Sequence, residues 1–201
     1  MAKKTERLAI RSEQLAQAVV EILAADGRGA LTRERISEVA GLSRPLIYYY
    51  FNSAEAVMAS AFKWICGRIL ELEEKVLDAG AAAGLDRLAE AFVPARERER
   101  RLYRAFFALL PEAVIKDDLK GEASRLRMRR RDLLAEVLLD AARAGEVRPP
   151  DGCDLDAIAG LLDGAALRAS IEEPATGKAA PSTIGDAVRR YLKPMRTAAA
   201  A

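Results

Sequence analysis

Apolar side chains recur along this chain every three or four residues, which is the spacing of helices that bury one face. The first stretch shows the pattern most clearly, with Leu15, Ala18, Val19, Ile22 and Leu23. Glycine, proline and capping residues interrupt the pattern at intervals and divide the chain into about nine predicted helices.

The predicted helices differ in length and in how they end. The first ends near Asp26, and two short ones follow: one begins at the N-cap Thr32 and stops at Gly41, and the next begins at Ser43. A long helix is expected from Ser53 to about residue 78. Further helices are expected over about 85–93, 102–110, 126–145, 155–171 and 184–196, with Pro94 and Pro111 each ending one and loops at 148–152 and 174–181.

Composition favours an all-α fold and excludes several kinds of chemistry. The 201 residues include 40 Ala and 25 Leu against 10 Val, 10 Ile and 5 Thr. The absence of histidine excludes Ser-His-Asp and Cys-His catalysis and His-ligated zinc, and we expect no cofactor and no metal. Cys66 and Cys153 lie far apart in the sequence, so each is expected to be a reduced, buried, small apolar residue.

Charge and hydropathy along the chain bear on its cellular location and on whether it associates with a membrane. The net charge of +2 is too small to demand an anionic partner, although residues 95–132 hold 12 Lys and Arg against 7 Asp and Glu. The opening residues lead into no uninterrupted apolar run, and no apolar stretch approaches the ~18–20 residues of a membrane span. We therefore expect a cytoplasmic protein with no signal peptide and no membrane association.

Residues 32–51 combine two short helices with the turn Gly41-Leu42-Ser43, the sequence form of a helix-turn-helix. At 100° per residue, Ile47 and Phe51 share the inward face of the second helix, whereas Pro45 and Tyr49 point the opposite way. Tyrosine hydroxyls donate to phosphates and the rings pack on sugars and thymine methyl groups, and Arg44 is placed to reach a guanine edge. The segment therefore predicts a DNA-reading surface.

The stretch GLSRPLIYYYF at residues 41–51, followed by Asn52-Ser53-Ala54-Glu55, closely resembles the helix-turn-helix signature of TetR-family transcriptional regulators. The resemblance covers residues 7 to about 60 by motif and the remainder by helix layout. It implies a DNA-binding domain at residues 1–53 and a helical effector-binding and dimerisation domain at 54–201. It also implies a homodimer that acts as a repressor, binds a palindromic operator on double-stranded DNA and is released by a small-molecule effector.

The resemblance also assigns roles by position. Thr32 and Arg33 would lie near the DNA backbone, and residues of the second short helix would contact bases or phosphates. Family members usually carry Lys before the acidic residue that opens the fourth helix, whereas Ala54 stands here, so the backbone N–H groups after Ser53 would hold the phosphate instead. The implied DNA-binding residues are Thr32, Arg33, Arg44, Pro45, Leu46, Tyr48, Tyr49, Tyr50 and Ser53.

Two weaker patterns concern the effector and the dimer. The effector is expected to be apolar with an acidic head held by Arg104, between aromatic walls; core packing and a solvated arginine are the plain alternatives. Gly160 and Gly164 allow two helices to approach closely, within one subunit or between subunits, and Asp163 could cap a helix or pair across the two-fold axis. The expected effector residues are Trp64, Phe92, Tyr103, Arg104, Phe106 and Phe107, and the expected interface residues are Gly160, Leu161, Gly164, Val188 and Leu192.

Two other classes of function compete with a regulator. An enzyme built on a helical bundle is disfavoured because the sequence has no ExxH carboxylate motif, no Gly-rich phosphate loop and no nucleophile elbow. A helical ligand-binding or adaptor protein with a weakened DNA-reading segment is favoured by Ala54 but disfavoured by the intact Arg44 and tyrosines. Salt-dependent DNA binding distinguishes this last class from a regulator.

Overall fold

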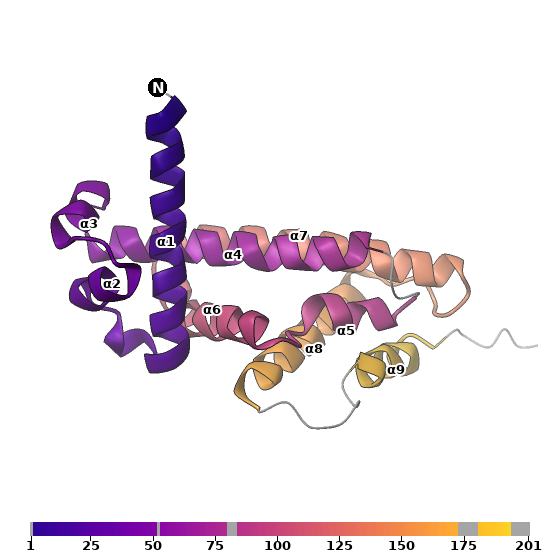
Figure 1. Cartoon of the computed structure of the whole chain (residues 1–201). Coiled ribbons are helices and arrows are strands. Elements are labelled where there is room, and N and C mark those ends of the chain that lie inside the picture. Colours follow the sequence, from indigo (N-terminus) through magenta and orange to yellow (C-terminus); the bar gives the residue numbers. More distant parts are fainter. Residues whose placement is uncertain (1, 52, 80–83, 173–180, 194–201) are drawn as a thin grey trace, which may run out of the picture. The chain divides into compact units, whose positions relative to one another are not determined.

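The computed structural model describes residues 2–51, 53–79, 84–172 and 181–193 (Figure 1). Over these residues the chain forms nine α-helices, one short 3-10 helix and no strand, which confirms the all-α prediction. The elements are α1 (Ala2–Asp26), η1 (Arg28–Ala30), α2 (Arg33–Ala40), α3 (Arg44–Tyr50), α4 (Ala54–Asp78), α5 (Asp86–Phe92), α6 (Glu97–Ile115), α7 (Asp117–Arg143), α8 (Gly152–Ile171) and α9 (Pro181–Tyr191).

The helices form two compact units of packing. Unit 1 comprises Met1–Ile69 and Glu97–Leu126, and unit 2 comprises Leu70–Arg96 and Arg127–Ala201. The division by packing therefore falls within α4 and α7, whereas the functional division expected between residues 53 and 54 lies at the start of α4 and stays a prediction.

In unit 1, α1 packs against α6 and α2, and α2 packs against α3. The inward face of α1 is the one that the sequence pattern predicts, because Val19 and Ile22 are both buried there. Phe62 of α4 and Leu109 of α6 are fully buried in the same unit. Burial of such large apolar side chains is the main term that stabilises the helices of unit 1.

Unit 2 has a core of its own, built from the second part of α4, α5, the second part of α7, α8 and α9. Leu88, Leu134 and Leu138 are fully buried in it, together with Leu162 of α8 and Val188 of α9. The loop between α7 and α8 is held at its end by a capping box, in which Asp151 and Asp154 each accept a hydrogen bond from the other's backbone N–H.

Three expectations need correction. Pro111 lies inside α6 instead of ending it: the helix forgoes one backbone hydrogen bond there, while buried Leu109 and Ala113 hold it on either side of the exposed proline. The helix expected over 126–145 begins earlier, at Asp117. Cys66 is buried as expected, but Cys153 is exposed in the first turn of α8.

Some expectations fall outside the described residues: most of the loop predicted at 174–181 and the end of the last helix. In the part of the chain that the structure describes, no helix has both the length and the apolar character to cross a membrane.

Candidate functional site

The turn between α2 and α3 is built by local interactions that the sequence specifies. Thr32 caps α2 by accepting a hydrogen bond from the backbone N–H of Arg35 at 3.2 Å. Gly41 ends α2 in the left-handed conformation, with φ of 63°, which favours glycine. The Ser37 hydroxyl then donates to the Leu42 carbonyl across the turn, so the direction in which the chain enters α3 is well defined.

The two faces of α3 differ as the helical phase predicts. Ile47 is 2 % exposed, whereas Tyr49 is 70 % exposed on the opposite side. Pro45 is also exposed and Leu46 is half-buried. The side chains of Tyr48 and Tyr50 lie outside the described residues. The α3 helix thus uses one aliphatic side chain to anchor it and presents an aromatic ring to the surroundings.

Charged groups flank this exposed face. The guanidinium of Arg44 lies in the first turn of α3, with its Nη1 3.9 Å from Oε1 of Glu34 on α2. Arg35, also on α2, pairs with Glu38 at 3.1 Å and with Asp26 at 3.7 Å. The hydrogen bond that Arg35 donates to Glu38 and the negative charge of that carboxylate raise the pKa of Arg35. Arg33 is half-buried.

Ser53 begins α4 as the sequence predicts, because its hydroxyl accepts a hydrogen bond from the backbone N–H of Ala56 at 3.1 Å. Glu55 follows in the first turn, where hydrogen bonds from its own backbone N–H and from Ser53 lower its pKa. The first turn of α4 therefore already holds a negative side chain, and its Ala56 N–H already donates to Ser53.

Three of the aromatic residues expected to line an effector site come together in unit 1. Phe106 stacks on Phe62 with ring centroids 5.7 Å apart, and Phe107 meets Phe106 edge-on at 5.4 Å. Tyr103 lies 6.3 Å from Phe107. Tyr103 and Phe106 are buried, while Phe107 is half-buried. The rings form one continuous aromatic cluster on α4 and α6.

The other two expected aromatic residues lie elsewhere. Trp64 of α4 is half-buried, with the guanidinium carbon of Arg68 6.0 Å from its ring centroid. Phe92 of α5 belongs to unit 2, where the Arg130 guanidinium carbon lies 5.2 Å from its ring centroid. Phe92 is thus a core residue of a different unit from the aromatic cluster.

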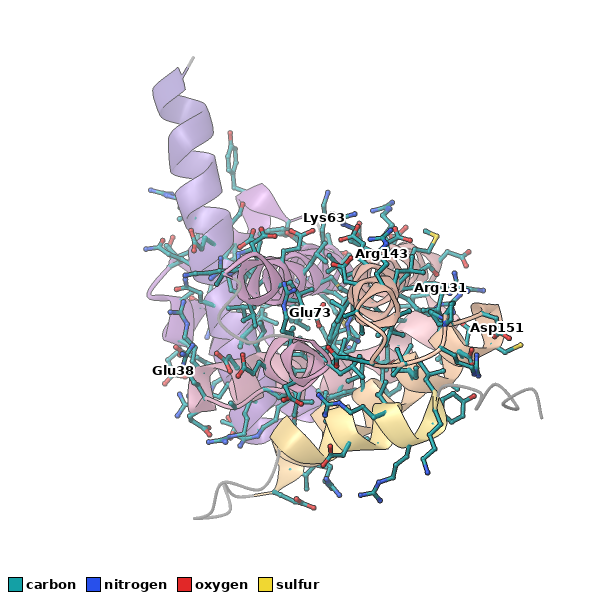
Figure 2. The ribbon with its side chains drawn as sticks, turned by 90° about the vertical axis from the view of Figure 1, so that its right-hand side faces the viewer. Glu38, Lys63, Glu73, Arg131, Arg143 and Asp151 are labelled. Atoms are coloured by element: carbon teal, nitrogen blue, oxygen red, sulfur yellow. The ribbon has the colours of Figure 1, made fainter. Side chains whose placement is uncertain are left out.

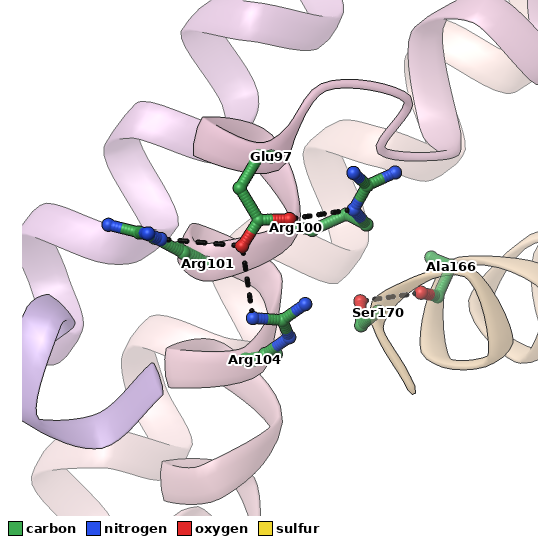
Figure 3. A network of polar contacts seen from close by, with 6 residues as sticks. All are labelled: Glu97, Arg100, Arg101, Arg104, Ala166 and Ser170. Carbon is green, nitrogen blue, oxygen red and sulfur yellow. Dashed lines mark hydrogen bonds and ion pairs between the residues drawn. The ribbon is translucent and has the colours of Figure 1, made fainter. Parts of the chain in front are cut away.

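Arg104 is one of three arginines that converge on Glu97 in the first turn of α6 (Figure 3). Its Nη1 lies 3.2 Å from the Glu97 carboxylate, which also accepts from Arg100 and Arg101. The hydrogen bond from Arg100 is the main reason that the pKa of Glu97 is lowered. Arg100 is the most buried of the three, a point the helical pattern of α6 indicates, since it precedes Tyr103 by three residues.

The α8 helix presents a small and apolar surface. Gly160, Leu161 and Gly164 are all exposed, and a Cβ placed on either glycine would meet open space. Within the part of the chain that the structure describes, the glycines therefore do not serve close packing. Val188 and Leu192, by contrast, are completely buried in the core of unit 2, and their assignment to a dimer interface stays a prediction.

A charged cluster that sequence reasoning missed joins α8 to α7 and α4. Arg130 of α7 places Nε 2.8 Å from the carboxylate of Glu73, and its Nη1 donates to Asp163 of α8. Glu73 is fully buried and lies in the interior of the side-chain view (Figure 2). The signal was present in the helical pattern: Glu73 lies four residues from Ile69 and from Leu77, on the apolar face of α4. Asp163 thus pairs within the chain.

Comparisons with known proteins show which family and which solved structures this chain is similar to. Residues 81–193 match the family described as BetI-type transcriptional repressor, C-terminal. The comparison with curated proteins gives no significant match.

Solved structures share the fold over nearly the whole chain. A protein described as a transcriptional regulator from Pseudomonas aeruginosa PAO1 is 22 % identical with a TM-score of 0.71, over 92 % of this chain and 89 % of that one. One described as a TetR-family transcriptional regulator from Rhodococcus sp. is 20 % identical with a TM-score of 0.71, over 90 % and 98 %. One from Saccharomonospora viridis, solved in complex with choline, is 14 % identical with a TM-score of 0.72, over 92 % and 96 %.

Proposed function

Because this chain belongs to the TetR family of transcriptional regulators, with a C-terminal region of the BetI type, we propose that it is a cytoplasmic repressor that binds a palindromic operator as a homodimer. A small-molecule effector releases it from DNA. Membership of this family makes the chain a DNA-binding regulator and not an enzyme.

The exposed face of α3 is the observation that carries operator binding. An exposed tyrosine and an exposed arginine on a short helix that buries Ile47 suit a recognition helix in the major groove. Arg44 donates to the O6 and N7 of a guanine, Tyr49 packs on bases or sugars, and Thr32, Arg33 and Ser53 lie beside the phosphates.

The test of operator binding starts from random-sequence duplex DNA. Sequences that the full-length protein enriches are measured again by fluorescence anisotropy at several salt concentrations. A palindromic consensus bound far more tightly than shuffled DNA is the expected result, with affinity falling as salt rises. An adaptor protein with a weakened DNA-reading segment would enrich no sequence.

Replacing the side chains assigned to bases sharpens this test. Arg44→Ala and Tyr49→Ala are each expected to weaken operator binding, and Arg44→Ala by about 1–3 kcal/mol with relaxed preference at one base pair. Both side chains are exposed, so circular dichroism and melting should be unchanged. Parental affinity in both variants would show that α3 does not read the bases.

The exposed face of α8 supports the homodimer. Gly160 and Gly164 leave room for a partner helix, and three large aliphatic side chains of the same helix are exposed to water: Leu161, Leu167 and Ile171. A second subunit on this face would bury these side chains. The dimer would then carry two DNA-binding domains, and once one is bound the other binds its half-site as an intramolecular step, which raises the affinity for the whole operator.

Two classes of effector are favoured by different observations. The aromatic cluster of unit 1, with Arg104 and two further arginines gathered at Glu97, suits an apolar molecule with an acidic head. Unit 2 already holds a cation, the Arg130 guanidinium, between the Phe92 ring and the Glu73 carboxylate. The choline complex of the S. viridis regulator makes an organic cation the second candidate.

A ligand series decides between the two classes. Fatty acids, acyl thioesters and aromatic acids form one arm, and choline and related cations form the other. The readouts are the fluorescence of Trp64, the one tryptophan, and release of operator DNA. Acids acting on both readouts, with the effect lost in Arg104→Ala, support the first class; response to cations alone rejects the role of Arg104. The coupling expected of such an effector is about 1–3 kcal/mol.

A further inference from the structure

Arg44, the arginine that we assign to contacts with DNA bases, has the carboxylate of Glu34 beside it. Glu34 occupies the first turn of α2, and its Oε1 lies 3.9 Å from Nη1 of Arg44 at the start of α3. Both side chains are exposed, at 59 % for Glu34 and 61 % for Arg44. Glu38, one turn further along the same helix, pairs instead with Arg35.

The stability of the fold does not account for the pair. An ion pair between two exposed side chains contributes little to folding, because water screens the charges and both side chains lose freedom when they meet. The helices α2 and α3 already pack against each other, each has a buried isoleucine, and the Ser37–Leu42 hydrogen bond spans the turn between them. The helix dipole favours a negative charge in the first turn of α2, but it does not require Glu34 to approach Arg44, so the pairing needs another reason.

A carboxylate in this position disfavours DNA in general, because phosphates repel it. It also competes with phosphates for the Arg44 guanidinium. A guanine edge offers two acceptors in a geometry that matches two N–H groups of arginine, and such a bidentate contact is stronger than a single contact with a phosphate. Arg44 thus gains more by leaving Glu34 for guanine than by leaving it for the backbone.

We propose that Glu34 is a specificity-determining residue, which acts by holding Arg44 away from phosphates until a guanine edge is offered. This inference rests on the proposed operator binding. Glu34 is a positioning residue in this role, since it acts through Arg44. Its effect is to lower the affinity for non-operator DNA more than the affinity for operator.

The matched variants are Glu34→Gln and Glu38→Gln. Each removes one negative charge from the exposed surface of α2, but only the first removes a partner of Arg44; Glu38 is labelled at the periphery of the molecule in Figure 2. Affinities for the selected operator and for shuffled DNA of the same length are measured at several salt concentrations. The ratio of the two affinities separates selectivity from the general effect of charge.

Glu34→Gln is expected to lower the operator-to-shuffled ratio about two- to five-fold relative to Glu38→Gln, the range that one exposed ion pair can supply. Melting temperatures should be unchanged in both variants. In the Arg44→Ala background the two substitutions should have equal effects, because the residue through which Glu34 acts is absent.

Three results would overturn the proposal. Equal ratios in Glu34→Gln and Glu38→Gln would mean that only charge matters. An effect of Glu34→Gln that persists without Arg44 would mean that Glu34 acts on DNA directly. A parent protein that selects no operator would remove the proposed function and this inference together, whereas the first two results leave operator binding intact.

Discussion

The exposed faces of α3 and α8 have opposite chemistry. The α3 face carries an aromatic ring and a guanidinium, at Tyr49 and Arg44. The α8 face carries two glycines and aliphatic side chains, among them Leu161 and Ile171, which is 74 % exposed. A surface of donors and rings suits a polyanion with polar grooves, whereas a small, apolar surface suits another helix.

The two helices are also anchored in different ways. The seven-residue α3 helix has Ile47 as its buried anchor. The longer α8 helix buries Ile158, Leu162 and Ala166, and Asp163 additionally joins it to Arg130 and, through Arg130, to buried Glu73. Among the α3 side chains that the structure describes, Ile47 is the buried one, whereas α8 is held by several buried apolar side chains and by the ion pair of Asp163 with Arg130.

The largest expected effect comes from the buried charge. Glu73→Ala removes the buried partner of Arg130 and is expected to destabilise the fold by about 3–5 kcal/mol, measured by urea unfolding. The double variant Glu73→Leu/Arg130→Met replaces both charges with apolar groups and should recover most of the loss. A Glu73→Ala protein within about 1 kcal/mol of the parent would show that the pair adds little to the anchoring of α8.

The next effect tests the anchor of α3. Ile47→Ala opens a cavity and is expected to cost about 2–5 kcal/mol of unfolding free energy. Tyr49→Ala, on the exposed face of the same helix, serves as the control and should change stability by no more than about 0.5 kcal/mol. Equal losses in the two variants would mean that the assigned faces of α3 are wrong.

A bulky side chain on α8 tests the nature of its exposed face. Gly164→Leu should prevent close approach of a partner helix and raise the dimer dissociation constant about ten-fold or more, which corresponds to about 1.4 kcal/mol. Sedimentation velocity over a concentration series measures it. Gly121→Leu on α7 is the matched control, since a Cβ there also meets open space. A monomeric parent, or equal effects in both variants, would contradict the assignment of this face.

The smallest expected effect concerns pH at the start of α8. Hydrogen bonds from Arg148, at 2.6 and 2.7 Å, and from the Asp151 N–H lower the pKa of Asp154. A carboxyl whose pKa is lower in the folded state adds stability above its unfolded pKa of about 3.9, and this contribution is lost as pH falls through the folded value. Asp154→Asn should therefore flatten the acid side of the stability profile. An unchanged slope below pH 4 would contradict this role.

Much of the fold could be predicted because its signals are local. Thr32, Gly41 and Ser53 mark helix ends through hydrogen bonds and backbone angles that involve only their neighbours. The exposed position of Tyr49 follows from 100° of rotation per residue once Ile47 is taken as buried. Pro111 shows the limit of local reasoning, since packing on either side of it keeps α6 continuous.

The candidate site could be predicted only in part. The spacing of apolar residues predicts that a helix face is buried, but it does not identify whether that face packs on the same chain or on a second subunit. Val188 and Leu192 have the same pattern whether they meet their own core or a second subunit. Nearly every side of α8 is apolar or small, so its pattern alone could not identify Gly160 and Leu161 as exposed.

The sequence by itself determined the all-α fold, the helix-turn-helix and the two faces of α3, because propensity, capping and periodicity act over a few residues. Only the tertiary structure decided which charges meet. Arg130 reaches Glu73 and Asp163 across 57 and 33 residues of chain, and Arg44 of α3 lies beside Glu34 of α2. Such pairs depend on how helices pack, which is a sum of many weak apolar contacts and has no signature at any one position.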